Sequence, residues 1–377
     1  MNNLSRVCIL LFFLGIVVSC DNIEMPIDSE NPAKEIFIEE DGGTRGMEVL
    51  SNNGFVIFNT NSFSILDENG EVLKRVPATS HIFANMTVDG NQIFLTGRSS
   101  SQDLIGLSAY SLNGDLLWDK VFTQTEGEVE IPNVRVFDEK LILAYISKNI
   151  SGTDQNQRTI NIEVFSKNGS TIETSKIIFE AETDFFTYNL LIESPKDFLV
   201  QGSRVISDSQ GSDPDIQVYR FQNGEFVWYK AVGPQGYSVI NKVIKSPSGG
   251  YLLIGSKQVT GWALELDANG NTLWDLDHGD GTNRFWFLDA LYLDSSIHFC
   301  GYTNATPQQL EAGLLYSTGL TGGSGFAKIF DGEEQQYRFN AIASRNTDEL
   351  VFAGNRSFMQ GSRIDSWILF TDGSGEK

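Results

Sequence analysis

The sequence predicts an all-β fold, a seven-bladed β-propeller of four-stranded antiparallel blades, from three repeated features. The first is a turn glycine beside an apolar run, which recurs along the chain at Gly70, Gly114, Gly169, Gly224, Gly270, Gly319 and Gly373. The second is an apolar strand that ends in a small residue, as in Tyr251–Gly255. The third is a tight turn before that strand, as at Pro247–Gly250. Four short strands in units of about 40–50 residues are typical of propeller blades.

The clearest unit is expected to contain four strands, at Ser238–Ser246, Gly250–Gly255, Trp262–Asp267 and Asn271–Asp277. Asn269 and Gly270 separate the last two of these apolar runs. Asn-Gly between apolar runs is a strong hairpin signal, because both turn residues then need positive φ. We therefore expect both residues of each Asn-Gly pair to adopt the left-handed conformation.

The two ends of the chain are expected to close the ring. The last repeat stops at Lys377, so the seventh blade lacks its outer strand, whereas Glu35–Glu40 forms a strand before the first repeat. We expect that strand to complete blade seven, because closure removes exposed sheet edges. The alternatives are an open array of sheets or two unrelated all-β domains. The β-propeller domain would then span residues 35–377.

The N-terminal residues 1–19 have the features of a secretory signal peptide. Arg6 is basic and Val7–Val18 is apolar, but twelve residues are too few for a helix to cross a bilayer core of about 30 Å. The segment ends in Val17-Val18-Ser19-Cys20, which resembles the bacterial lipobox. That resemblance implies cleavage before Cys20 and lipidation of Cys20. An ordinary signal peptide with a chance cysteine is the alternative.

Residues 20–34 are polar and contain two prolines, which is typical of a flexible tether. Two or three acyl chains hold a protein firmly on a membrane. We therefore expect a lipid-anchored protein of the bacterial cell envelope, at the outer membrane, with the leaflet left open. Its partner through the anchor is the membrane, and its body is expected to be monomeric.

The chain is strongly acidic, which bears on its partners. It carries 27 Lys and Arg against 49 Asp and Glu, a formal net charge of −22. Such a charge repels phosphate backbones, so we expect no nucleic-acid partner. The 41% hydrophobic residues are enough for a packed core, and three cysteines do not make a disulfide framework.

The unit Ser246–Asp280 resembles repeats of the pyrroloquinoline-quinone-like β-propeller group, which also contains non-enzymatic lipoproteins. The repeat tryptophan is present only as Trp118, Trp228 and Trp274, which we expect to pack between neighbouring blades rather than to form a ligand platform. The resemblance implies one alternative function, a quinone-dependent oxidoreductase with a bound calcium, an aspartate base and often a vicinal cysteine pair. Cys300 is the only cysteine of the body, and we expect it to be a buried, inert thiol.

Variable loops on a regular scaffold are the predicted binding surface. The segment between the second and third strands differs in length from blade to blade, and such loops usually carry binding residues. We expect it to lie beside the connections between blades and to bind a protein or a glycan without catalysis. The candidate binding residues are Arg98, Arg158, Phe185, Arg204, Tyr237, Phe285, Trp286, Tyr337 and Arg356. The alternative is that these rings cap the cores of the blades.

Metal and catalytic residues are weakly indicated. Asp275, Asp277 and Asp280 could bind calcium, although their spacing departs from that of a calcium-binding loop, and no cofactor is expected otherwise. A second weak acidic cluster is Asp208, Asp213 and Asp215. No catalytic residue is assigned, because His81, His278 and His298 fall in no nucleophile motif. A carbohydrate-active enzyme with carboxylates around the axis stays an alternative.

Overall fold

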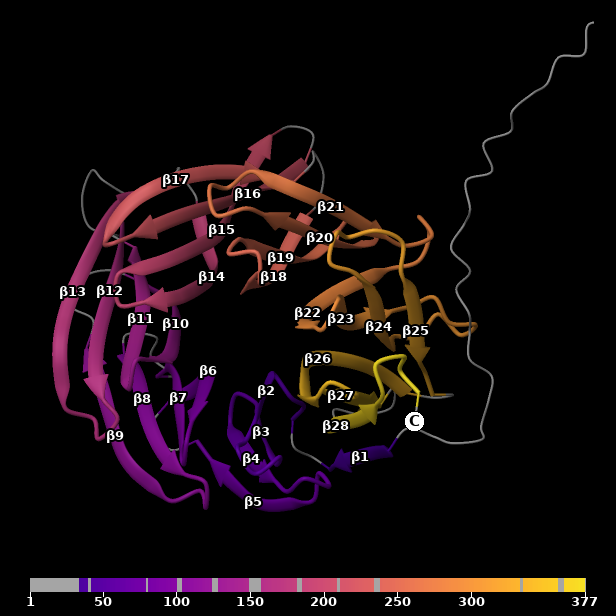
Figure 1. Cartoon of the computed structure of the whole chain (residues 1–377), viewed down its shortest axis with the longest axis horizontal. Coiled ribbons are helices and arrows are strands. Elements are labelled where there is room, and N and C mark those ends of the chain that lie inside the picture. Colours follow the sequence, from indigo (N-terminus) through magenta and orange to yellow (C-terminus); the bar gives the residue numbers. More distant parts are fainter. Residues whose placement is uncertain are drawn as a thin grey trace, which may run out of the picture.

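The computed structural model describes residues 34–39, 42–78, 81–99, 104–123, 128–148, 157–181, 185–208, 211–233, 238–332, 335–358 and 363–376. Within these ranges the regular secondary structure consists of β-strands, which form seven four-stranded antiparallel sheets. The sheets stand in a ring around a central opening (Figure 1). The prediction of a seven-bladed β-propeller is confirmed. The predicted signal peptide, Cys20 and the tether up to residue 33 lie outside the described residues.

Each blade runs in chain order from an inner to an outer strand, except that blade seven takes its outer strand from the N-terminal part of the chain. Blade one contains β2 (Gly46–Val49), β3 (Phe55–Phe58), β4 (Ser62–Leu66) and β5 (Val72–Pro77). Blade two contains β6 (Ile82–Asp89), β7 (Gln92–Arg98), β8 (Leu104–Ser111) and β9 (Leu116–Thr123). Blade three contains β10 (Glu128–Phe137), β11 (Lys140–Lys148), β12 (Gln157–Ser166) and β13 (Thr171–Glu180).

Blade four contains β14 (Phe185–Ser194), β15 (Asp197–Asp208), β16 (Gly211–Gln222) and β17 (Glu225–Val232). Blade five contains β18 (Ser238–Lys245), β19 (Tyr251–Lys257), β20 (Thr260–Leu266) and β21 (Thr272–His278). Blade six contains β22 (Phe285–Leu293), β23 (Ser296–Thr303), β24 (Ala312–Gly319) and β25 (Phe326–Phe330). Blade seven contains β26 (Gln335–Asn346), β27 (Glu349–Phe358) and β28 (Ile364–Thr371), completed by β1 (Lys34–Ile38).

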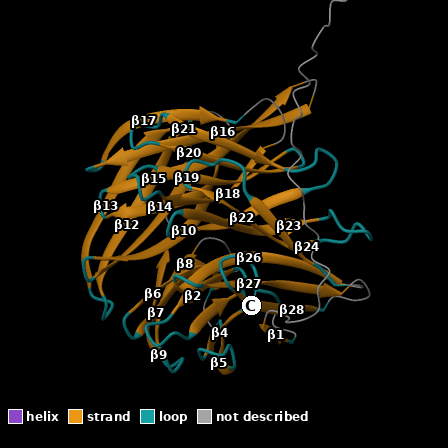
Figure 2. Cartoon of the chain, turned by 45° about the vertical axis from the view of Figure 1, so that its right-hand side comes forward, coloured by secondary structure: helices purple, strands orange, loops and turns teal. Residues whose placement is uncertain are grey.

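The middle strands carry the apolar core because each blade is packed between two others. Strand β19 is buried from Tyr251 to Ser256, on both faces of its sheet. In the outer strand β21 of the same blade, the first two residues are exposed, and buried or partly buried residues then alternate with exposed ones. Neighbouring blades stack face to face around the ring (Figure 2). Both faces of each middle strand are therefore removed from water, and this burial is the main source of stability.

The ring is closed as predicted. Strand β1 pairs antiparallel with β28, from Lys34 opposite Phe370 to Ile38 opposite Ser366. Just before blade one, the Thr44 amide donates to Asn355 Oδ1 of blade seven at 2.6 Å. The described residues contain no helix that could span a membrane.

The turns between third and outer strands only partly follow the Asn-Gly prediction. Gly270 has the expected positive φ, but Asn269 does not, and Asn223 is the one asparagine of these described turns with a positive φ, of 54°. In blade five the Asp267 amide donates to Asn271 O at 2.8 Å and its carboxylate accepts the amides of Asn269 and Asn271. An acidic residue at the start of the loop therefore shapes a three-residue turn in which only glycine needs to be left-handed.

Two turn glycines were predicted at the wrong positions. In blade six the residue with positive φ is Gly322, not Gly319, and in blade seven it is Gly375, not Gly373. The Gly375 amide donates to Asp372 O, so that loop begins at Asp372 in the same way that the blade-five loop begins at its own aspartate. The position of the residue that starts the loop decides which glycine becomes left-handed.

The repeat tryptophans pack between blades, as expected. Each indole lies on the left-handed glycine of the next blade and donates its Nε1–H to a carbonyl of that turn. Trp118 donates to Lys167 O at 2.9 Å and Trp228 donates to Ala268 O at 3.0 Å. Trp274 donates to Leu320 O at 3.1 Å. The tryptophan and the turn glycine thus form one joint between adjacent blades.

This joint predicts different effects for two similar substitutions. Gly224 and Gly270 both have φ of +81°, but only Gly270 has a neighbour, with the Trp228 ring 3.1 Å from the position of an added Cβ. Both alanine variants lose about 1–2 kcal/mol from the left-handed backbone. We expect Gly270→Ala to lose about 1 kcal/mol more, because the indole must move. Urea unfolding of the two variants measures the difference, and equal losses would show that the joint relaxes freely.

Candidate functional site

The predicted binding residues can be placed on the two faces of the ring. We define the loop face as the face on which the second strand of a blade connects to the third and the outer strand connects to the next blade. The opposite face, which carries the glycine turns, is the turn face. Trp286 is paired with Tyr302, and Tyr337 is paired with Arg356, so all four lie toward the loop face.

Three of the predicted binding residues are buried inside blades. Phe185, Phe285 and Arg158 have no exposed surface. Arg158 Nη2 donates to Phe185 O at 2.7 Å, which joins blade three to blade four. The prediction that Arg158 lies on an open loop surface is therefore wrong, because the residue sits within β12 and faces the neighbouring blade. The two phenylalanines cap blade cores, which was the alternative interpretation.

The other candidates are more accessible or lie outside the description. Arg98 ends β7, and Trp286, Tyr337 and Arg356 are partly exposed. Tyr237 lies outside the described residues, and of Arg204 only the place of its backbone in β15 is described. The surface that the described residues define therefore belongs mainly to blades six and seven.

One group on this surface combines aromatic and charged side chains, and we call it the Trp286 cluster. The rings of Trp286 and Tyr302 lie 5.4 Å apart, and the Arg338 guanidinium lies 4.4 Å from the centre of the Tyr302 ring. Arg338 Nη2 donates to Glu311 Oε1 at 2.7 Å. The four residues come from blades six and seven, and sequence reasoning had named only Trp286. Aromatic rings with an arginine are typical of protein-binding hot spots and of stacking surfaces.

The predicted residue Arg356 belongs to a second group that helps to close the ring. Its guanidinium lies 3.6 Å from the centre of the Phe37 ring of β1 and pairs with the completely buried carboxylate of Asp365. Arg363 binds the same carboxylate through Nε at 2.8 Å and also pairs with Glu39 at 3.0 Å. Both arginines therefore tie the N-terminal strand to blade seven.

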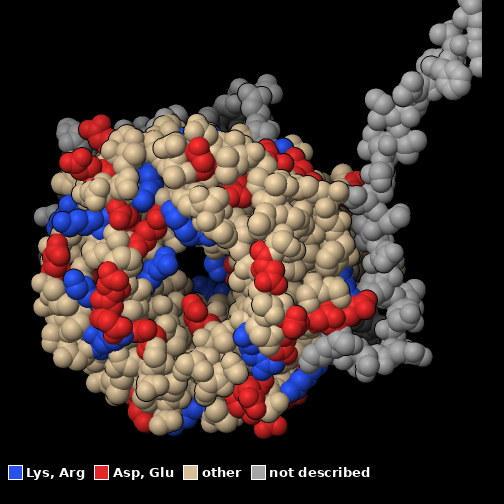
Figure 3. Space-filling view, viewed as in Figure 1, with Lys and Arg blue, Asp and Glu red and all other residues tan. Residues whose placement is uncertain are grey.

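A channel runs along the axis of the ring. The cavity has a volume of about 530 Å³, and all seven inner strands or the residues beside them line it. Figure 3 shows the opening, with basic and acidic side chains close to its rim. The charged residues of the lining are Arg45, Glu48, Arg135, Lys242, Lys245 and Asp289.

Asparagine side chains connect the blades around this channel. Asn133 Nδ2 donates to Leu190 O, and Asn241 Nδ2 donates to Phe287 O, both at 2.7 Å. Asn340 likewise donates to Thr44 O at 2.6 Å. Each bond reaches the next blade, close to the bulge of an inner strand. The sequence signal was present, since an asparagine beside apolar residues recurs at Asn85, Asn133, Asn189, Asn241 and Asn340.

Charges of both signs meet at mid-height in the channel. Lys242 Nζ pairs with Asp289 Oδ2 at 2.6 Å across blades five and six. Burial raises the pKa of Glu48, although the nearby Lys242 and Arg135 lower it. Burial works against the charge of Lys242, but the Asp289 carboxylate nevertheless raises the pKa of that ammonium group. All three residues line the cavity, where Glu48 and Lys242 are exposed and the Asp289 side chain is buried.

The histidines and Cys300 are packed within blades. His298 Nδ1 is 2.7 Å from Ser317 Oγ, and burial lowers the pKa of His298. The rings of His81 and Phe83 lie 5.3 Å apart, and burial lowers the pKa of His81 as well. Burial also raises the pKa of the Cys300 thiol well above its usual value. The expectation of a buried thiol is confirmed.

The aspartates considered for calcium each have a separate partner. Asp275 accepts from Trp262 Nε1 at 2.5 Å, and Asp277 pairs with Lys257 at 3.0 Å. Asp280 accepts the amide of Thr282 at 2.8 Å within its own loop. Among the described residues no group of three or more His, Cys, Asp or Glu is arranged to hold a metal ion. The structure therefore does not gather these three carboxylates into one ligand set.

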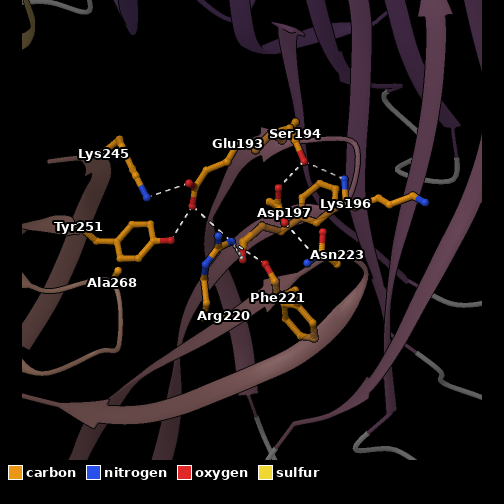
Figure 4. Close-up of polar contacts among 12 residues, drawn as sticks. Glu193, Ser194, Lys196, Asp197, Arg220, Phe221, Asn223, Lys245, Tyr251 and Ala268 are labelled. Carbon is orange, nitrogen blue, oxygen red and sulfur yellow. Dashed lines mark hydrogen bonds and ion pairs between the residues drawn. The ribbon is translucent and has the colours of Figure 1, made fainter. Parts of the chain in front are cut away.

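A polar cluster that sequence reasoning missed joins blades four and five toward the turn face (Figure 4). The Glu193 carboxylate accepts from the Tyr251 hydroxyl at 2.6 Å and pairs with Lys245 at 2.8 Å and Arg220 at 3.3 Å. Burial and the bond to Glu193 raise the pKa of Tyr251. The side chains come from strands that are far apart in sequence, so no local motif indicates them.

Comparison with known proteins supports the β-propeller fold but assigns no function. No protein-family model matches the chain. No curated protein matches it either. A hydrazine synthase chain of Kuenenia stuttgartiensis has 10% identity and a TM-score of 0.55, with 89% of this chain and 97% of that chain covered. A Dyadobacter fermentans protein of unknown function has 10% identity and a TM-score of 0.50, over 90% and 98% of the two chains.

A puromycin hydrolase has 9% identity and a TM-score of 0.55, over 89% of this chain. The alignment covers 52% of the hydrolase, so the present chain corresponds to about half of that enzyme's length. At such low identity these likenesses concern the propeller architecture and assign no activity. The residues of the loop face and channel have to be judged by their own chemistry.

Proposed function

We propose that this protein is a lipid-anchored, extracytoplasmic binding module that holds a protein or glycan ligand on its loop face without catalysis. The observation that carries the proposal is the Trp286 cluster. Its partly exposed indole is held beside Tyr302 and Arg338 on two rigid blades, at the face where the connections between strands vary most. A rigid aromatic surface loses little conformational entropy on binding, which suits recognition of a ligand.

The placement of the acid–base groups supports a binding role. The three histidines lie in blade interiors, and the Asp289 carboxylate of the channel is engaged by Lys242. General acid–base catalysis needs a group within hydrogen-bond reach of a substrate. The described histidines are instead occupied by packing against aromatic rings or by a bond to Ser317.

The direction of β1 supports an orientation relative to the membrane. Lys34 pairs with Phe370 near the turn face, whereas Ile38 pairs with Ser366 nearer the loop face. A chain anchored at Cys20 would therefore reach the propeller from the turn-face side. We infer that the loop face points away from the membrane that holds the lipid, where it is accessible to a ligand.

Binding assays on a soluble form test the proposal. Protein that starts at Asp21 would be applied to a glycan array and to immobilised envelope proteins, and the ligand retained would be titrated. We expect Trp286→Ala to weaken binding by about 30-fold, as for an interface hot spot. Phe226→Ala is the matched control, because it removes an exposed ring of the outer strand β17 away from the loop face. Unchanged affinity of a folded Trp286→Ala protein would contradict the proposal.

A further inference from the structure

The axial channel differs in charge from the rest of the chain. Its lining holds four cations, Arg45, Arg135, Lys242 and Lys245, but only two carboxylates, Glu48 and Asp289. The whole chain has a formal net charge of −22. A cationic excess inside a low-dielectric wall concentrates the field and attracts anions. The channel is therefore suited to an anionic ligand, although the chain as a whole is acidic.

The cations of the channel are not equally available. Lys242 is paired with Asp289, and Lys245 is paired with Glu193. Arg135 is exposed to the channel and uses Nη1 to donate to Ile192 O at 2.7 Å. In the part of the chain that the structure describes, no carboxylate lies within ion-pair distance of Arg135. A guanidinium has five N–H donors, so most of those of Arg135 are left for a ligand.

Arg135 and Lys242 line the same cavity although they lie on different blades. Glu48 lines this cavity as well, and the positive charges of both residues lower its pKa. The surrounding wall is polar and includes the amides of Asn133, Asn189 and Asn241. A cavity of about 530 Å³ is within the range of small-molecule sites.

We propose that the channel binds a small molecule that carries a carboxylate or phosphate group, with its oxyanion held by Arg135 beside Lys242. The guanidinium would donate two parallel bonds to the oxyanion, the geometry in which arginine binds such groups best. The Lys242 ammonium, already oriented by Asp289, supplies further positive charge. Glu48 opposes the ligand by its negative charge and limits the affinity. The site is separate from the Trp286 cluster and does not depend on the function proposed for the loop face.

Calorimetric titration of the soluble protein with citrate and, separately, with inorganic phosphate tests the site. Binding of either probe supports it, and the tighter probe identifies the preferred oxyanion. We expect Arg135→Gln to weaken binding by at least 10-fold, Arg135→Lys to weaken it less, and Glu48→Gln to strengthen it severalfold. The opposite signs of the Arg135 and Glu48 effects separate an anion site from general damage to the fold. Glu48→Gln also keeps the test decisive if the arginine variants fail to fold.

Lys176→Gln is the matched control, because it removes one positive charge from the exposed outer strand β13. It should leave the affinity unchanged, whereas a loss equal to that of Arg135→Gln would show nonspecific attraction and overturn the proposal. Absence of binding of both probes to the wild type at millimolar concentration would also overturn it, as would weakening by Glu48→Gln. A neutral sugar that binds equally well to the wild type and to Arg135→Gln would show that the channel does not select an oxyanion.

Discussion

Removal of residues 34–39 is expected to lower the free energy of unfolding by at least about 4 kcal/mol. The deletion takes away β1, whose Ile36 and Ile38 pack against the apolar core between blades one and seven, whereas Phe37 packs against the core between blades six and seven. Burial of one such side chain contributes about 1.5–3 kcal/mol, and these three are partly buried. The deletion also removes the backbone bonds to β28 and the contacts of Phe37 and Glu39 with the blade-seven arginines.

The loss should have a second, visible consequence. Without β1 the strand β28 becomes an exposed edge with apolar neighbours, and such edges pair with other chains. We therefore expect the protein that starts at residue 40 to associate in solution, while the protein that starts at residue 34 stays monodisperse. Urea unfolding and light scattering of the two proteins measure both effects. Identical unfolding midpoints would show that ring closure by β1 does not stabilise the propeller.

The fold could be predicted to this depth because it depends on local signals that repeat. Left-handed glycines, such as Gly270, mark a turn wherever the chain has to reverse, and the tryptophans recur at a fixed distance from them. These signals predict seven blades, a last blade that lacks its outer strand, and one unmatched strand before the first repeat. The misplaced glycines of blades six and seven show the limit of this approach. Where two glycines lie close together in the sequence, the residue at which the loop begins determines which of them has a positive φ.

The candidate site could be predicted only in part, because rings bring together residues that are far apart in sequence. Trp286 was found from its loop, but Arg338 and Glu311 were missed because their contact crosses from one blade to the next. Arg158 was assigned to the surface from its place near a variable loop, whereas its side chain turns into the next blade. The channel charges were missed altogether, since a strand pattern does not show which residues of an inner strand face the axis.

Replacement of Asp365 is expected to be the most damaging single change near the loop face. Its side chain has no exposed surface and binds Arg356 at 2.5 Å and Arg363 at 2.8 Å. Removing one partner of a buried ion pair leaves an uncompensated charge and typically loses about 3–5 kcal/mol. We expect Asp365→Ala to lose about 4 kcal/mol in urea unfolding. Asp365→Asn should lose less, because its amide oxygen still accepts one bond.

The control for that loss is an ion pair on the surface of another blade. Asp277 and Lys257 lie 3.0 Å apart with 46% and 25% of their side chains exposed. Solvent screens such pairs, so Asp277→Ala should change stability by less than about 1 kcal/mol. Replacing Arg356 by methionine in the Asp365→Ala protein should restore part of the stability, since it removes the stranded charge. Equal effects of Asp365→Ala and Asp277→Ala would contradict the idea that a buried carboxylate fastens β1 to blade seven. A large difference between them would instead show that the Asp365 carboxylate, which pairs with two arginines, stabilises blade seven.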